Sequence, residues 1–104
     1  MTDQITTDEF GAADGVADWR VRDGSAEAVF RTGSFAAGVR LVDEIGEIAD
    51  ALDHHPDVDL RYGAVTVRTW SHDVGGLTRR DTELARRVSE AARELDIPAD
   101  PAGA

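Results

Sequence analysis

The sequence predicts a two-layer α+β domain, in which helices pack on one face of a four-stranded antiparallel sheet. Two pairs of segments alternate apolar and polar residues, and each pair is joined by a short turn that contains glycine. Two longer segments repeat apolar residues at helical spacing. The predicted order is helix, hairpin, helix, hairpin, helix, and we expect the two hairpins to join in one sheet.

The N-terminal part contains a short helix and the first hairpin. We expect residues 1–6 to be flexible and residues 7–13 to form a helix that Thr7 caps. Residues 18–22 then alternate Trp19 and Val21 with arginines, which is typical of a half-buried strand. Asp23-Gly24 predicts a tight turn, and residues 26–32 form the returning strand.

A long helix is predicted over residues 35–52. Ser34 caps it, and Pro56 lies just beyond its end. Its acidic residues lie off the centre of a single apolar stripe. The residues of this stripe are Phe35, Val39, Val42, Ile45, Ile48 or Ala49, and Leu52.

The second hairpin has strands over residues 58–62 and 64–72, with the turn at Gly63. Side chains on a strand alternate between its two faces. The second strand therefore has one face with Val65, Val67, Thr69 and Ser71, and another with Thr66, Arg68, Trp70 and His72.

The last helix begins at Thr78, where T-R-R-D resembles a capping box with Asp81 in the acidic position. Its apolar stripe consists of Leu84, Val88, Ala91 or Ala92, and Leu95. Residues 98–104 are expected to form a flexible tail, so the predicted domain covers residues 7–97.

Composition excludes several classes of function. The net charge of −10 argues against nucleic acid and anionic membranes as partners, since both need a positive protein surface. There is no cysteine, and all 11 basic residues are arginine, which excludes thiolate and lysine Schiff-base chemistry. The acidic N-terminus differs from a secretory signal, and no apolar run is long enough to span a membrane, so a cytoplasmic protein is expected.

All three histidines lie in the segment from Asp50 to Asp81. His54 and His55 precede Pro56, which pushes the residue before it out of helical geometry, so both rings can face one pocket. Asp50 lies four residues before His54 on the same helix face and can orient its ring. His72 ends a strand beside Trp70 and just before a Gly-Gly pair. These rings suit proton transfer near neutral pH.

Alternative interpretations of these residues remain open. The His-His-Pro segment is also typical of an ordinary helix end, and Asp81 of an ordinary helix start. A zinc site, and with it a metal-dependent hydrolase, is disfavoured because adjacent histidines seldom ligate one metal. Ser71, His72 and Asp73 cannot form a serine triad, because neighbouring strand residues face opposite sides. Tryptophans such as Trp19 are more often core or interface residues than ligand contacts.

The motif D-x-x-D-H-H-P, a Tyr-Gly turn and then V-x-V-x-x-x-S-H-D-x-G-G-L-T-x-x-D resembles the pterin-4a-carbinolamine dehydratase family. The resemblance covers about residues 19–95, and the order of elements agrees with the fold of that family. It implies a hydro-lyase that converts 4a-hydroxytetrahydrobiopterin to quinonoid dihydrobiopterin in tetrahydrobiopterin recycling. It also implies no metal or cofactor, a pterin substrate, and a homodimer or homotetramer.

The resemblance assigns roles to particular residues. It implies that His54, His55 and His72 are catalytic, and we expect His54 and His72 to form the acid/base pair while His55 positions the pterin. It implies support from Asp50, Asp53 and Asp81. Substrate contacts are implied for His54, His55, Pro56, Ser71, His72, Asp73, Val74 and Trp19.

One position departs from the family pattern. Val58 stands where the family often has an aromatic residue, and Trp70 or Trp19 can take its place in the pocket wall. Some relatives are non-catalytic interaction modules, acting as transcription-factor dimerisation partners or assembly chaperones. That function is the alternative for this chain, although chaperone-type relatives have lost the histidines that it keeps.

Overall fold

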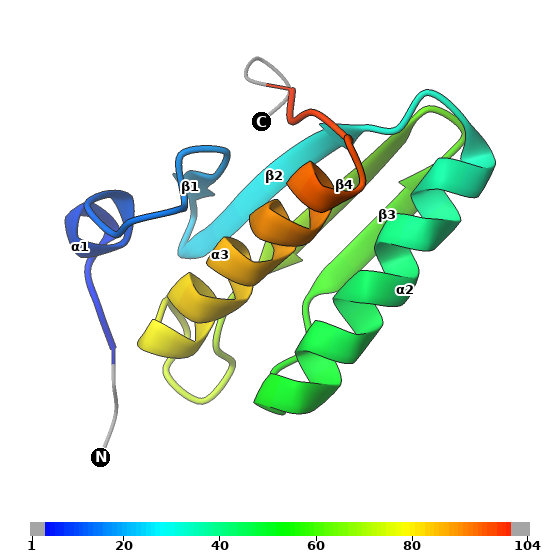
Figure 1. Cartoon of the computed structure of the whole chain (residues 1–104). Coiled ribbons are helices and arrows are strands. Elements are labelled where there is room, and N and C mark those ends of the chain that lie inside the picture. The colour runs from blue at the N-terminus through cyan, green and yellow to red at the C-terminus, as the bar shows by residue number, and fades with distance from the viewer. Residues whose placement is uncertain (1–3, 101–104) are drawn as a thin grey trace.

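The computed structural model describes residues 4–100. Its four strands are β1 (Arg20–Arg22), β2 (Ser25–Arg31), β3 (Asp57–Arg61) and β4 (Ala64–Thr69). They form one antiparallel sheet in the order β1-β2-β4-β3. The helices are α1 (Thr7–Gly11), α2 (Phe35–Leu52) and α3 (Arg79–Glu94), of which α2 and α3 lie side by side on one face of the sheet (Figure 1). The predicted α+β fold and its order of elements are confirmed.

The core lies between the sheet and the two long helices. Every second side chain of the central strands points into it, as strand geometry requires. The contributing residues are Ala26, Ala28 and Phe30 from β2, Val65 and Val67 from β4, Leu41, Ile45 and Ala49 from α2, and Leu84, Val88 and Ala92 from α3. No helix among residues 4–100 is both long and apolar enough to cross a membrane.

The predicted apolar stripe of α2 is wrong at its N-terminal end. Phe35 is 50% exposed and Val39 is 40% exposed, whereas Leu41 is fully buried. The helix packs on the sheet and also on α3. Its buried side is therefore centred on Leu41 and Ile45, and Phe35 and Val39 lie at its margin.

Three predicted boundaries also need correction. Helix α1 is capped by Thr6 in a capping box with Glu9, and it ends at Gly11 rather than at residue 13. Strand β4 ends at Thr69 rather than at residue 72, because the chain turns back immediately and Ser71 pairs with Gly76. The other strands begin or end within one or two residues of the predicted positions.

Both described ends of the chain are hydrogen-bonded to the domain, and the flexibility expected of residues 1–6 and 98–104 stays a prediction. The N–H of Ile5 donates to the carbonyl of Leu77 at 2.9 Å. The N–H of Asp100 donates to the carbonyl of Val29, and that of Arg31 to the carbonyl of Pro98, both at 2.8 Å. Residues 1–3 and 101–104 lie outside the described residues.

Candidate active site

The end of α2 directs His54 toward the sheet. Helix α2 ends at Leu52, and Asp53 adopts a left-handed conformation with φ of 51°. The N–H of His54 then donates to the carbonyl of Ala49 at 3.0 Å, which closes the helix end. The spacing predicted that His54 shares a helix face with Asp50. The left-handed residue instead takes both histidines off the helix before Pro56.

Asp81 is the acceptor for the His54 ring. Nε2 of His54 lies 2.6 Å from Oδ1 of Asp81, and the side chains are 10% and 0% exposed. Asp81 is the third residue of α3 and completes the predicted capping box, in which its Oδ2 accepts the N–H of Thr78 at 2.9 Å. One carboxylate therefore caps a helix and holds an imidazole.

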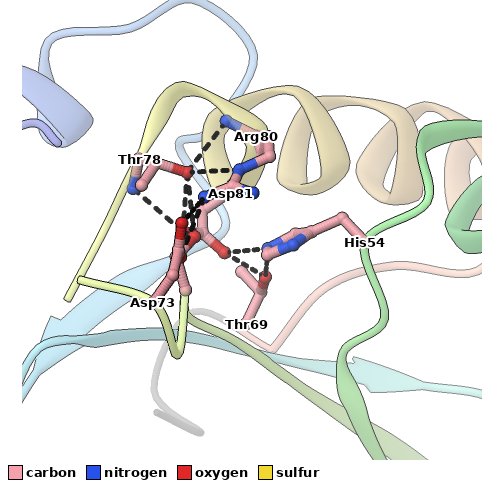
Figure 2. A network of polar contacts seen from close by, with 7 residues as sticks. His54, Thr69, Asp73, Thr78, Arg80 and Asp81 are labelled. Atoms are coloured by element: carbon pink, nitrogen blue, oxygen red, sulfur yellow. Dashed lines mark hydrogen bonds and ion pairs between the residues drawn. The ribbon is translucent and has the colours of Figure 1, made fainter. Parts of the chain in front are cut away.

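Hydroxyl groups fill the remaining positions around this carboxylate, as Figure 2 shows for Thr69 and Thr78. Thr69 donates to Oδ1, which also accepts from His54, and Ser71 donates to Oδ2 at 2.7 Å. The hydroxyls of Ser71 and Thr78 are 2.8 Å apart. All three hydroxyl residues are buried. A buried carboxylate is stable as an anion only with such donors, and the start of a helix favours negative charge as well.

This arrangement determines which nitrogen of His54 carries hydrogen. An ionised carboxylate only accepts hydrogen bonds. Nε2 must therefore be the donor to Asp81. Nδ1 of His54 has no hydrogen-bond partner within residues 4–100. In the neutral ring Nδ1 is then the basic nitrogen, and the carboxylate stabilises the positive charge that the ring gains on taking a proton.

His55 takes the partner that was predicted for His54. Its Nε2 lies 2.9 Å from Oδ1 of Asp50, and the two side chains are largely exposed. Asp50 therefore orients His55 rather than His54. Asp53 has the left-handed backbone conformation that ends the helix just before the two histidines.

The turn after β4 brings His72 and Asp73 beside this cluster. His72 stacks on Trp70, with ring centroids 3.9 Å apart and planes tilted by 31°. Asp73 receives two hydrogen bonds of 3.0 Å from Arg80. These bonds, more than any other cause, lower the pKa of Asp73, and the charge of His54 adds a small effect in the same direction.

The predicted site residues are only partly brought together. No hydrogen bond or ring contact within residues 4–100 joins His72 to His54 or His55. Ser71 is buried against Asp81 and His72 is exposed, so the expected alternation of faces is confirmed for this pair. Pro56 and Val74, both partly buried, lie in the two segments that flank the cluster.

Trp19 lies in the core instead of at the site. It is 5% exposed, packs edge-on against Phe30, and donates its indole N–H to Ser89 at 2.9 Å. It therefore cannot replace the aromatic residue missing at Val58, whereas Trp70 is partly exposed beside His72. In the described part of the chain, no three side chains of the metal-ligating types cluster closely enough to hold a metal ion.

Comparisons with known proteins identify the family. The family model described as pterin 4 alpha carbinolamine dehydratase matches residues 2–91. The chain belongs to this family.

Two relatives share the name "Putative pterin-4-alpha-carbinolamine dehydratase". The protein of Nocardia farcinica is 38% identical over 95 residues, covering 89% of this chain and all of the relative. That of Halobacterium salinarum is 38% identical over 93 residues, covering 86% and 98%. A crystal structure of a transcriptional coactivator/pterin dehydratase from Brucella melitensis is 27% identical, with a TM-score of 0.72 over 82% of this chain and 90% of that one.

Sequence reasoning missed two residues of the cluster in this carbinolamine dehydratase family member. Thr69 and Thr78 were assigned only to a strand face and a helix cap, yet both hydroxyls contact Asp81. The signal was present, because the predicted alternation placed Thr69 and Ser71 together with Val65 and Val67 on the face that is buried under the helices. Polar residues on a buried face require partners, and the capping carboxylate supplies them.

Proposed function

We propose that the protein dehydrates 4a-hydroxytetrahydrobiopterin to quinonoid dihydrobiopterin, as part of tetrahydrobiopterin recycling. Membership of the dehydratase family supports this reaction class. The observation that carries the proposal is the His54–Asp81 pair, which holds one imidazole with its N–H directed into a buried carboxylate. Such a pair is suited to taking a proton from a substrate, because the charged ring that results is stabilised in place.

The reaction requires one base and one acid. In our proposal, Nδ1 of His54 takes the proton from N5 of the pterin, and the electron pair of that N–H bond forms the C4a=N5 double bond. The C4a–O bond breaks at the same time, and His72 gives a proton to the departing oxygen, which leaves as water. His55, held by Asp50, positions the pterin ring. Exchange of protons with solvent restores both histidines, so no cofactor takes part.

The position of the turn from Ser71 to Gly76 supports the role of His72. Ser71 donates to Asp81, and Asp73 accepts from Arg80 in the first turn of α3. His72 lies between these two residues in sequence. A substrate bound over the exposed edge of His54 would thus lie beside this turn. The Trp70 ring supports the His72 ring from one side.

Stopped-flow measurement of carbinolamine dehydration tests the assignment. Replacing His54 or His72 by alanine should lower kcat by about 10²–10⁴-fold, the usual contribution of a positioned acid or base. Replacing His55 should mainly raise KM. Wild-type turnover by the His54 variant would refute the base role, and wild-type turnover by the His72 variant would refute the acid role. Circular dichroism provides the check on folding.

A second candidate is a non-catalytic interaction module on the same fold. The Brucella protein, named as both coactivator and dehydratase, favours it, and so do the exposed side chains of Phe35 and Val39 on α2. A purified protein that does not accelerate dehydration but binds a protein partner tightly would reverse the ranking.

We also expect a homodimer or homotetramer in the cytoplasm. Light scattering after size exclusion will measure the mass of the assembly. A monomer at micromolar concentration would refute the expected self-association, but not the reaction.

A further inference from the structure

The outer face of the sheet, opposite α2 and α3, contains a cavity that the histidine cluster does not use. Its volume is about 220 Å³. It lies beside the β1–β2 hairpin and reaches β4. The residues that line it are Arg20, Arg22, Asp23, Ser25, Glu27 and Arg68.

Sheet register explains why three arginines meet there. Glu27 pairs with Arg20 on one neighbouring strand and with Arg68 on the other. Arg22 pairs with Ser25 in the next row. Paired residues share a face of the sheet, and the buried neighbours of Glu27, Ala26 and Ala28, occupy the opposite face. The sequence pattern thus gathers three of its 11 arginines around one hollow, in a chain whose net charge is −10.

One hydrogen bond orients the side chain of Arg68 and leaves other N–H donors of its guanidinium group unused. Its Nε donates to the hydroxyl of Ser25 at 3.1 Å, and that hydroxyl donates to the carbonyl of Arg22 at 3.1 Å. Among residues 4–100 the two terminal amino groups of Arg68 have no hydrogen-bond or ion-pair partner. Glu27 forms no ion pair with Arg68 despite their pairing in the sheet. These amino groups are therefore available to a ligand.

The chemistry and the size of the cavity indicate the class of that ligand. A guanidinium group presents parallel N–H donors that match the oxygens of a phosphate or a carboxylate. The volume equals that of about seven water molecules at ~30 Å³ each, which is below the ~300–1,000 Å³ of pockets for drug-sized ligands. The cavity suits one oxyanion group with its hydration, and its lining has three arginines against the two carboxylates of Asp23 and Glu27.

We propose that this cavity is a binding site for a small oxyanion, either a phosphate or a carboxylate group, which bonds the terminal amino groups of Arg68 beside Arg20 and Arg22. The site is separate from the proposed dehydratase reaction, since it shares no lining residue with the His54 cluster. The negative charge of Glu27 repels the anion. We therefore expect the affinity of the cavity for the anion to rise when Glu27 is replaced by a neutral residue.

Titration with inorganic phosphate at constant ionic strength and pH, followed by two-dimensional amide NMR of the whole chain, tests the site. The amides of Gly24, Ser25 and Glu27 should shift in a saturable manner. The indole N–H of Trp70 should shift as well, because Trp70 directly follows β4 and its Cα can lie at most about 7 Å from that of Arg68, two residues earlier. The indole N–H of Trp19, which is buried against Ser89, is the internal control and should not shift.

Variants separate this site from general charge effects. Arg68→Gln should weaken phosphate by at least about tenfold, and Glu27→Gln should tighten it by several-fold, since each change alters one close charge interaction. Arg61→Gln is the matched control. Arg61 lies on β3 of the same sheet, is bonded to Asp59, and does not line the cavity. It should leave the affinity unchanged.

A parallel titration with acetate distinguishes the two sources of the oxyanion. Saturable binding of phosphate alone assigns a phosphate group, and equal or tighter binding of acetate assigns a carboxylate. Shifts that grow linearly with both anions, or an equal loss in the Arg61 and Arg68 variants, would overturn the proposal. If Arg68→Gln fails to fold, the Glu27→Gln result decides: unchanged or weaker binding would overturn it.

Discussion

Replacing Asp81 by asparagine separates the two roles of this carboxylate. The amide has the same shape but only one acceptor oxygen. Its oxygen should take the position of Oδ2, because the N–H of Thr78 is fixed as a donor by the helix start. The NH₂ group then takes the position of Oδ1 and faces His54 and Thr69. The hydroxyl of Thr69 can rotate to accept, and His54 can accept only if its hydrogen moves to Nδ1.

The cost in stability should be small, whereas the cost in activity should be large. The variant keeps the number of hydrogen bonds. Bonds to a charged group, worth about 1.5–3 kcal/mol, become bonds to a neutral group, worth about 0.5–1.5 kcal/mol, and this lowers stability. The penalty for burying a charge disappears at the same time, and this raises stability. We expect the free energy of unfolding to change by less than about 2 kcal/mol on this comparison. Because the proposed basic nitrogen is now protonated, kcat should fall by about 10²–10⁴-fold.

Three measurements check this reasoning. Stopped-flow dehydration gives kcat, urea denaturation gives the free energy of unfolding, and nitrogen-15 NMR of the imidazole reports which nitrogen of His54 carries hydrogen. Asp59→Asn is the matched control, because Asp59 is an exposed carboxylate bonded to Arg61 on β3. An Asp81→Asn enzyme with wild-type kcat, or with hydrogen still on Nε2 of His54 and a low kcat, would refute the explanation.

Two further predictions concern stability. Ser89→Ala removes the buried acceptor of the Trp19 indole N–H and should lower the free energy of unfolding, measured in urea, by about 1–3 kcal/mol. In a Trp19→Phe background the same change should cost much less, because the donor is already absent. An equal cost in both backgrounds would exclude the hydrogen bond as the cause. Hydrogen bonds from Arg86, and then from Arg87, lower the pKa of Glu83. A depressed carboxyl pKa stabilises the fold above the unfolded value and loses this effect as pH falls through the folded one. Glu83→Gln should therefore cost about 0.3–0.5 kcal/mol per pair at neutral pH and nothing in acid; a cost independent of pH would contradict this.

The sequence was sufficient for the architecture because its signals are local. Asp23-Gly24 and Gly63 mark the turns, and alternation in the strands together with the 3.6-residue period in α3 identifies the buried faces. Prediction failed where a tertiary contact decides. The α2 stripe was centred wrongly, because the burial of Leu41 rather than Val39 depends on how the helix packs against α3 and the sheet. The hydrogen bonds that join residues 98–100 to β2 were not predicted, because this pairing has no local signal.

The sequence named His54, Asp81 and Ser71 but not the contacts between them, and it missed Thr69 and Thr78. Spacing along a helix placed Asp50 with His54, but the left-handed Asp53 ends the helix and exchanges the partners, so that Asp50 contacts His55. The contact between His54 and Asp81 spans 27 positions, and only the fold brings them together. Trp19 was expected to contact the substrate, yet it is buried in the core, where its indole N–H donates to Ser89.

Asp81, the third residue of α3, both caps this helix and holds the His54 ring, and this limits how the protein can be engineered. General capping preferences favour glutamate there, since the longer side chain reaches back to the cap most readily. Here the extra methylene would have to fit in a space that is 0% exposed and already filled by three hydroxyl residues. A stabilisation strategy based on helix statistics would thus recommend glutamate at position 81, where the buried space has no room for it. Any laboratory evolution of the first turn of α3 should therefore be screened for turnover as well as for melting temperature.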